Sequence, residues 1–153
     1  MRTLKLTQSI YLQILATIGK HSPECGGILG GTVAGEITEF FFDSTGESSP
    51  MGYTPDVEAV NQMLIDDWMP RGILMQGIVH SHAEQNTVPS CGDVGYGIRI
   101  LQALDTVDSF YLPIVTVHNG QMRMDCYEIC RDEENGFVCR QVEWDIVGEQ
   151  KNG

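Results

Sequence analysis

The chain has 153 residues, of which 42% are hydrophobic and 20% are charged, and its formal net charge at pH 7 is −12. This length and composition support a buried hydrophobic core, which excludes a disordered protein and predicts one domain over residues 1–153. No apolar run approaches the ~18–20 residues of a membrane span. The negative charge argues against nucleic acid as a ligand, because phosphate binding depends on Lys and Arg. The charge serves solubility, or alternatively a preference for a basic substrate segment.

The N-terminus and the cysteines favour a cytoplasmic location. Met1-Arg2-Thr3 is followed by an amphipathic pattern and not by the apolar region of a signal peptide. The five cysteines, an odd number without such a signal, predict reduced thiols. Cys126, Cys130 and Cys139 lack the Cys-x-x-Cys spacing of zinc ribbons, so we expect buried thiols that act as small hydrophobes and not a metal site.

The first third of the chain predicts a helix followed by a hairpin. Thr7 is expected to cap a helix whose apolar stripe contains Ile10, Ile14 and Ile18. A strand over residues 26–33 is crowded with glycine, which indicates close approach of another backbone or a ligand. Residues 36–42 form the return strand.

A polar loop over residues 43–53, which we expect to lie near the functional site described below, then leads to a second helix. That helix should begin at Thr54-Pro55-Asp56, with a cap, a first-turn proline and a first-turn acid, and end at Pro70. Residues 73–79 are apolar and β-branched, and they predict a buried strand that runs into His80-Ser81-His82.

The last part of the chain predicts a helix and then a meander of strands. A helical period starts at Ser90 and contains Val94, Ile98, Leu101 and Leu104. Residues 110–118 form a strand in which Pro113 favours a sheet edge or a bulge. The turn signals Asn119-Gly120 and Asn135-Gly136 separate the later strands, the last of which spans residues 137–144. The residues from Gly148 to Gly153 are expected to fray.

This order of elements predicts an α/β (α+β) domain with a mixed sheet and helices on its faces.

The motif around the buried strand carries the chemistry. Side chains two apart on a strand point to the same face, so His80 and His82 can converge on one ion. A loop over residues 83–89 leads to Ser90-x-x-Asp93, which places Asp93 in the first turn of a helix, where its carboxylate can reach the histidines. Two imidazoles and one carboxylate leave a fourth position open, as expected of a catalytic zinc ion.

The spacing His80-x-His82, seven residues, Ser90-x-x-Asp93 resembles the signature of the JAMM metalloproteases, whose characteristic fold is the MPN domain. That family also carries an upstream Glu in the context Glu-x-x-Gly-x-Leu-x-Gly, and residues 24–31 of this chain fit this pattern with Glu24 at its start. The order of segments from about Leu4 to Trp144 resembles one compact prokaryotic MPN domain of the JAB type. One departure is Ala83, where many members have proline.

The resemblance implies a three-layer α-β-α domain with a central, mixed and curved sheet flanked by helices. It implies one zinc ion held by His80, His82 and Asp93, with Glu24 as the general base that activates the zinc-bound water and Ser90 as the oxyanion donor. It further implies cleavage after the C-terminal tail of ubiquitin, or of a ubiquitin-like or sulfur-carrier protein.

Other interpretations of the same residues remain. Ser90-x-x-Asp93 is close to a capping box, although a capping hydroxyl keeps its own hydrogen free to donate. His82-Ala-Glu84 matches the His-x-Glu of zinc nucleobase deaminases, but the Pro-Cys-x-x-Cys that those enzymes need is missing. A non-catalytic MPN scaffold that only binds partners is the other alternative, although such members usually lose one or more ligand residues.

Overall fold

The computed structural model describes residues 3–49, 52–83, 86–104, 107–134 and 136–148. The α-helices are α1 (Gln8–Ala16), α2 (Val57–Met63) and α3 (Cys91–Ala103). The strands are β1 (Leu4–Thr7), β2 (Gly26–Gly31), β3 (Glu36–Ile37), β4 (Glu39–Phe42), β5 (Glu47–Ser49), β6 (Gly52–Thr54), β7 (Leu74–Ser81), β8 (Ser109–His118), β9 (Gln121–Asp132), β10 (Gly136–Val142) and β11 (Trp144–Val147). Asn135 of the expected turn, Glu84 of the deaminase-like motif, and most of the expected frayed end lie outside the described residues.

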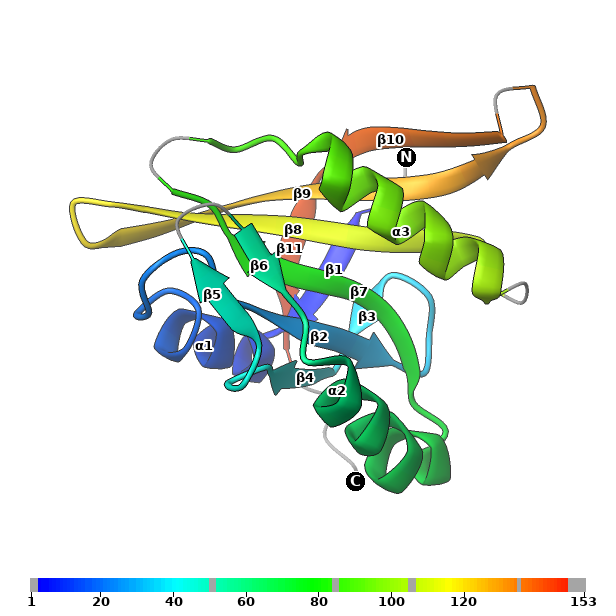
Figure 1. The fold of residues 1–153 in the computed structure, drawn as a ribbon, viewed down its shortest axis with the longest axis horizontal. Helices are drawn as coiled ribbons and strands as arrows, with labels where there is room; N and C mark the ends of the chain where they lie inside the picture. The colour runs from blue at the N-terminus through cyan, green and yellow to red at the C-terminus, as the bar shows by residue number, and fades with distance from the viewer. Residues whose placement is uncertain (1–2, 50–51, 84–85, 105–106, 135, 149–153) are drawn as a thin grey trace.

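A six-stranded mixed sheet is the centre of the fold, with the strand order β10-β9-β8-β7-β2-β4. Strands β7 and β8 are parallel, and the other neighbours in this sheet are antiparallel. A second sheet, β11-β1-β3, is parallel, and β5 and β6 form a separate hairpin. Figure 1 shows α3 lying along β8 and β9. The expected α/β (α+β) class with a mixed sheet is confirmed.

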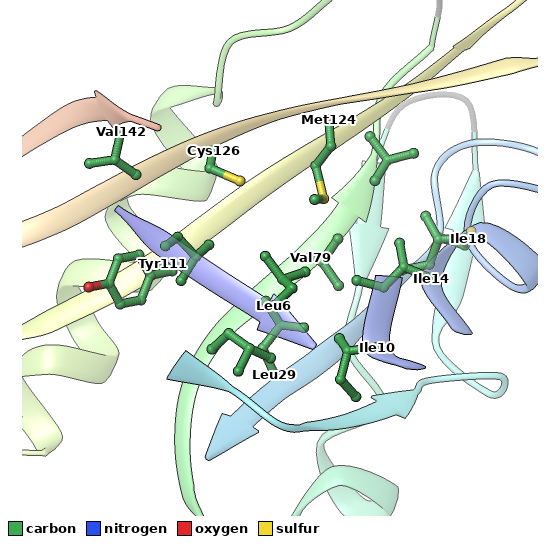
Figure 2. Close-up of a cluster of buried hydrophobic side chains, with 14 residues drawn as sticks. Leu6, Ile10, Ile14, Ile18, Leu29, Val79, Tyr111, Met124, Cys126 and Val142 are labelled. Atoms are coloured by element: carbon green, nitrogen blue, oxygen red, sulfur yellow. The ribbon is translucent and has the colours of Figure 1, made fainter. Parts of the chain in front are cut away.

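Hydrophobic clusters cover both faces of the large sheet, because neighbouring residues on a strand point to opposite sides. Leu29 of β2 packs with Ile14 of α1 and Leu6 of β1 in the cluster that Figure 2 draws. Ile28, the preceding residue, packs in the second cluster with Val60 of α2 and Leu101 of α3. Helix α1 therefore covers one face of the sheet, and α2 and α3 cover the other.

Local signals in the sequence set several element boundaries. Thr7 caps α1 by accepting a hydrogen bond from the Ile10 backbone N–H at 3.3 Å, and Ser90 caps α3. Asn119 and Gly120 have φ angles of 51° and 75° in the tight turn between β8 and β9, as a type I′ turn requires. These three predictions are confirmed.

The helix that was expected to begin at Thr54 begins instead at Val57. Thr54 is paired with Glu47 in the β5–β6 hairpin, so Asp56 is the cap and accepts a hydrogen bond from Ala59 N–H at 3.1 Å. The expected loop over residues 43–53 contains most of this hairpin. Its polar composition hid the strands, because a hairpin outside the main sheet buries little apolar surface.

Pro70 does not end the second helical segment. After α2 the chain continues through a π-helical turn, Leu64–Trp68, and a 3-10 turn, Met69–Arg71, that contains Pro70. Gly72 ends it with a left-handed φ of 71°.

Three strand predictions also need correction. Pro113 lies in β8, inside the sheet and not at an edge, where it falls between the positions at which β8 pairs with β7. The return strand expected over residues 36–42 is divided into β3 and β4, which belong to different sheets. The strand expected over residues 137–144 likewise ends at Val142, and β11 begins at Trp144 and pairs with β1.

Among the described residues, no helix is long and apolar enough to cross a membrane.

We predict that the core beneath α1 is a main source of stability. Ile14 is fully buried and Leu12 of the same helix is 51% exposed. Ile14→Ala should lower the free energy of unfolding by about 2–5 kcal/mol, because it removes buried methyl groups and leaves a cavity. Leu12→Ala should change it by no more than about 0.5 kcal/mol. Urea denaturation of both variants measures the difference, and equal losses would contradict the packing described.

Candidate metal centre

The two histidines lie where β7 meets both of its neighbours. His80 is paired with Gly26 of β2 and with Ile114 of β8. His82 follows the last residue of β7, and its backbone N–H donates to the Val115 carbonyl at 2.9 Å. Both imidazoles are buried, with 3% and 5% of the residue exposed. The expectation that the strand itself ends in His82 is one residue too long, but the pairing with β8 continues there.

Asp93 reaches the histidines from the first turn of α3. The helix begins with a capping box: Ser90 Oγ accepts from Asp93 N–H at 3.0 Å, and Ser90 N–H donates to Asp93 Oδ2 at 2.8 Å. The same Oδ2 lies 3.2 Å from Nε2 of His80 and 3.2 Å from Nε2 of His82. Asp93 therefore caps its helix and faces both imidazoles at once.

Glu24 approaches the histidines from a different element, the segment just before β2. The backbone N–H of Ser81 donates to the Cys25 carbonyl at 2.9 Å, and the Cys25 N–H donates to Ser81 Oγ at 3.1 Å. These bonds place the preceding residue, Glu24, with its Oε1 3.8 Å from His82 Nε2. The side chain of Glu24 is only 15% exposed.

Two triads of potential ligands share the two imidazoles. Glu24, His80 and His82 each offer a ligand atom within 4.8 Å of the others. The Asp93 triad is tighter, with sides of 3.2 and 3.2 Å to the imidazoles and 2.8 Å between the two Nε2 atoms. Metal–ligand bonds of 2.0–2.1 Å at tetrahedral angles require about 3.3–3.4 Å between ligand atoms. The triad of His80, His82 and Asp93 is thus closer than the Glu24 triad to the spacing of metal ligands.

The hydrogen bonds of the two rings differ. His82 Nδ1 lies 3.0 Å from the Asn86 carbonyl, which fixes Nδ1 as the N–H donor. In the neutral ring this leaves a lone pair on Nε2, the nitrogen that faces Asp93. His80 Nδ1 is buried and has no hydrogen-bond partner among the described residues. The polar contacts of His80 are therefore all made by Nε2, with Asp93 and His82, and the ring lacks the second bond that Asn86 gives to His82.

The pKa values follow from the same contacts. Burial opposes the ionised form of Asp93, but hydrogen bonds with His80 and His82 and the charge of His80 outweigh it and lower the pKa of the carboxyl well below its usual range. Burial also lowers the pKa of His82, but its bonds to Asp93 and to the Asn86 carbonyl raise it above the ordinary value overall. The group as a whole favours a positive charge beside the Asp93 carboxylate.

A pocket of about 410 Å³ opens above these residues. Glu24, His80, His82 and Asp93 line it together with Ser90, residues of β6 and residues of α3. Its lining among the described residues includes two carboxylates and neither Lys nor Arg. The five residues expected to form the site from the sequence thus line one cavity.

No thiol belongs to the candidate ligand group of the described residues, and all five thiols are free. Cys126 is buried as expected, but Cys130 is half-buried and Cys139 is exposed, so the expectation of buried thiols is wrong for Cys139. Cys139 lies on β10, which is an edge strand of the sheet and receives less cover.

Comparison with known protein families gives no match, and comparison with curated proteins gives none either.

Sequence reasoning missed two contributors to the pocket. Asn86 supplies the carbonyl that orients His82, and Tyr53 of β6 lies over His80 with ring centroids 6.4 Å apart. The residue type gives no signal for a contact made by a backbone carbonyl, and the sequence predicts a loop around Tyr53. The only indication for Tyr53 is that this loop, residues 43–53, is expected to lie near the site.

We predict that the imidazoles and Asp93 bind one divalent metal ion per chain. His80→Ala and His82→Ala should abolish tight binding in zinc titrations, because each removes a donor that both triads share, and Asp93→Ala should weaken it, because only the wider Glu24 triad remains. His118→Ala, at the exposed end of β8, is the matched control and should bind like the wild type. Undiminished metal in a folded His82→Ala variant would contradict the ligand assignment.

Proposed function

We propose that the protein is a zinc-dependent peptidase or isopeptidase of the JAMM type. The observation that carries this proposal is the convergence of His80, His82 and Asp93, with Glu24 beside them, in one pocket. The spacing resemblance concerns order along the chain, and the convergence concerns distance in space, and both place the same residues in one site.

The donor set suits zinc. Two imidazole nitrogens and one carboxylate oxygen are ligands of the borderline kind that zinc prefers, and three protein ligands leave a position for water or substrate. A bound zinc ion would polarise a carbonyl and lower the pKa of water to about 7. We assign His80, His82 and Asp93 to the ligand role because their atoms are the closest together.

Glu24 has the position of a general base. Its carboxylate lies 3.8 Å from His82 Nε2, farther than Asp93, and its side chain has limited contact with solvent. A carboxylate at the edge of the donor triangle can accept a proton from the attacking water and return it to the leaving amine. It does not need to bind the metal for this role.

Ser90 is suited to stabilise an oxyanion. Its Oγ lines the pocket and accepts the Asp93 N–H in the helix cap. Because this bond uses the oxygen as an acceptor, the hydroxyl hydrogen remains free to donate toward negative charge that develops on a substrate oxygen.

The proposed substrate is the C-terminal tail of ubiquitin, or of a ubiquitin-like or sulfur-carrier protein, joined to a lysine or to a short extension. The two carboxylates in the pocket lining, without Lys or Arg among its described residues, suit an uncharged or basic segment. We further propose that the sheet and its helices form the three-layer MPN arrangement, which the clusters on both faces support. The five free cysteines suit a cytoplasmic setting.

We predict that Glu24→Gln separates metal binding from catalysis. Gln keeps the size and can still hydrogen-bond, but it cannot take a proton. Zinc content should stay at the wild-type level, and hydrolysis of a ubiquitin-like protein with a cleavable C-terminal fusion should fall at least ~10²–10⁴-fold. Glu143→Gln, at an exposed position, is the control. Loss of zinc from Glu24→Gln would make Glu24 a ligand, and full activity with full zinc would rule out the mechanism.

Ser90→Ala should reduce turnover without removing zinc. Loss of one oxyanion donor typically costs about 10²–10³-fold in kcat, and loss of the cap should cost about 1 kcal/mol of stability. The backbone bond from residue 90 to Asp93 Oδ2 survives this change, so the carboxylate should keep its place. Turnover, zinc content and urea denaturation are measured together. A stability loss with unchanged turnover would reduce Ser90 to a helix cap.

A further inference from the structure

Tyr53 of β6 lies against Gly26 of β2 and faces the His80 ring of the neighbouring strand β7. Its ring lies nearly parallel to the His80 imidazole, with centroids 6.4 Å apart and an interplanar angle of 26°. Gly26, the residue of β2 paired with His80, leaves room for this ring, because a Cβ on Gly26 would lie 2.4 Å from Tyr53 Cε2. Tyr53 therefore covers His80 and its cross-strand neighbour together.

Asp43, at the end of β4, holds Tyr53 in this position. The Tyr53 hydroxyl donates to Asp43 Oδ2 at 2.7 Å, and the Asp56 backbone N–H donates to the same oxygen at 2.9 Å. Asp43 is 3% exposed, and its own N–H is bonded to the Gly26 carbonyl at 3.0 Å. One buried carboxylate thus ties the end of β6 and the start of α2 to the sheet edge.

The need for such a support is specific to His80. A ligating histidine is usually oriented by a hydrogen bond from its second ring nitrogen. His82 has this bond, to the Asn86 carbonyl, whereas Nδ1 of His80 has no partner among the residues that the structure describes. Packing against Tyr53 supplies the orientation that a hydrogen bond supplies for His82.

We propose that Tyr53, held by Asp43, is a positioning residue that keeps the His80 ring aimed at the metal. This inference rests on the metal-binding part of the proposed function and not on the identity of the substrate. It assigns the β5–β6 hairpin a role in metal affinity, and it explains why glycine stands at position 26.

The test compares zinc affinity, measured by competition with a chromophoric chelator, across three variants. Loss of groups that orient a metal ligand typically weakens metal binding 10–100-fold, and we expect Tyr53→Leu to fall in this range. Tyr53→Phe keeps the ring but loses the bond to Asp43, so its affinity should lie between those of the wild type and Tyr53→Leu. Tyr11→Leu removes a tyrosine that stacks on Trp144, away from the pocket, and should lose stability without losing zinc affinity.

Cobalt-substituted protein gives a second readout that mere destabilisation would not move. The visible absorption bands of the bound cobalt should change in Tyr53→Leu, be largely restored in Tyr53→Phe and match the wild type in Tyr11→Leu. Wild-type affinity and an unchanged cobalt spectrum in Tyr53→Leu would overturn the inference. If Tyr53→Leu fails to fold, wild-type affinity in Tyr53→Phe would overturn the part assigned to Asp43, and weakened affinity would support it.

The outcomes also separate this inference from the proposed function. Zinc binding by the wild type, with weaker zinc affinity in Tyr53→Leu, would support the positioning role. If the same wild-type protein cleaved no ubiquitin-like fusion, the peptidase proposal would be contradicted while the positioning role stood. A wild-type protein that binds no metal overturns both.

Discussion

The antiparallel pairing of β2 with β7 is the interaction on which the site depends. It sets Gly26 opposite His80 and joins Ser81 N–H to the Cys25 carbonyl, and the Cys25 N–H donates in turn to the Ser81 hydroxyl. Glu24, which is distant in the chain, thereby reaches His82. On its other side β7 is parallel to β8, and the bond from His82 N–H to the Val115 carbonyl extends that pairing past the end of the strand. Backbone pairing on both sides therefore fixes the position of His80, and His82 is held by the β8 side and by its neighbour Ser81.

The start of α3 links secondary structure to chemistry through one oxygen atom. Asp93 Oδ2 accepts the Ser90 N–H and also faces both Nε2 atoms. A helix N-terminus carries a partial positive charge that holds a carboxylate in place, so the cap orients Asp93 without help from the imidazoles. The carboxylate is thus preorganised, and little conformational entropy remains to be lost when it meets a cation.

Features that depend on local chemistry could be predicted from the sequence, and features that depend on distant contacts could not. The caps at Thr7 and Ser90 and the turn at Asn119-Gly120 depend on only a few neighbouring residues, and the structure has them at the predicted positions. The interior position of Pro113 and the division of residues 36–42 between two sheets depend on which strands become neighbours. Periodicity within a segment contains no information about its partner.

The candidate site divides in the same way. The spacing of His80, His82 and Asp93 is local enough for one strand and the following helix to bring them together. The approach of Glu24 could not be derived from residue patterns and came only from the family resemblance. The contact between Tyr53 and Asp43 could not be predicted from the sequence, because it requires the β5–β6 hairpin to fold back onto the edge of the large sheet.

The electrostatics of the pocket favour a cation at the point where these elements meet. Two carboxylates and two imidazoles line it, and no Lys or Arg is present among its described lining residues to neutralise them. Buried charges are costly unless they are paired, and the raised pKa of His82 with the lowered pKa of Asp93 is the pairing that protons provide. A divalent metal ion would provide the same neutralisation with fixed geometry and would displace those protons. The contacts that pair these charges are therefore those that a metal ion would replace, while the Asn86 carbonyl and the Tyr53 ring lie beside the two imidazoles without taking part in that pairing.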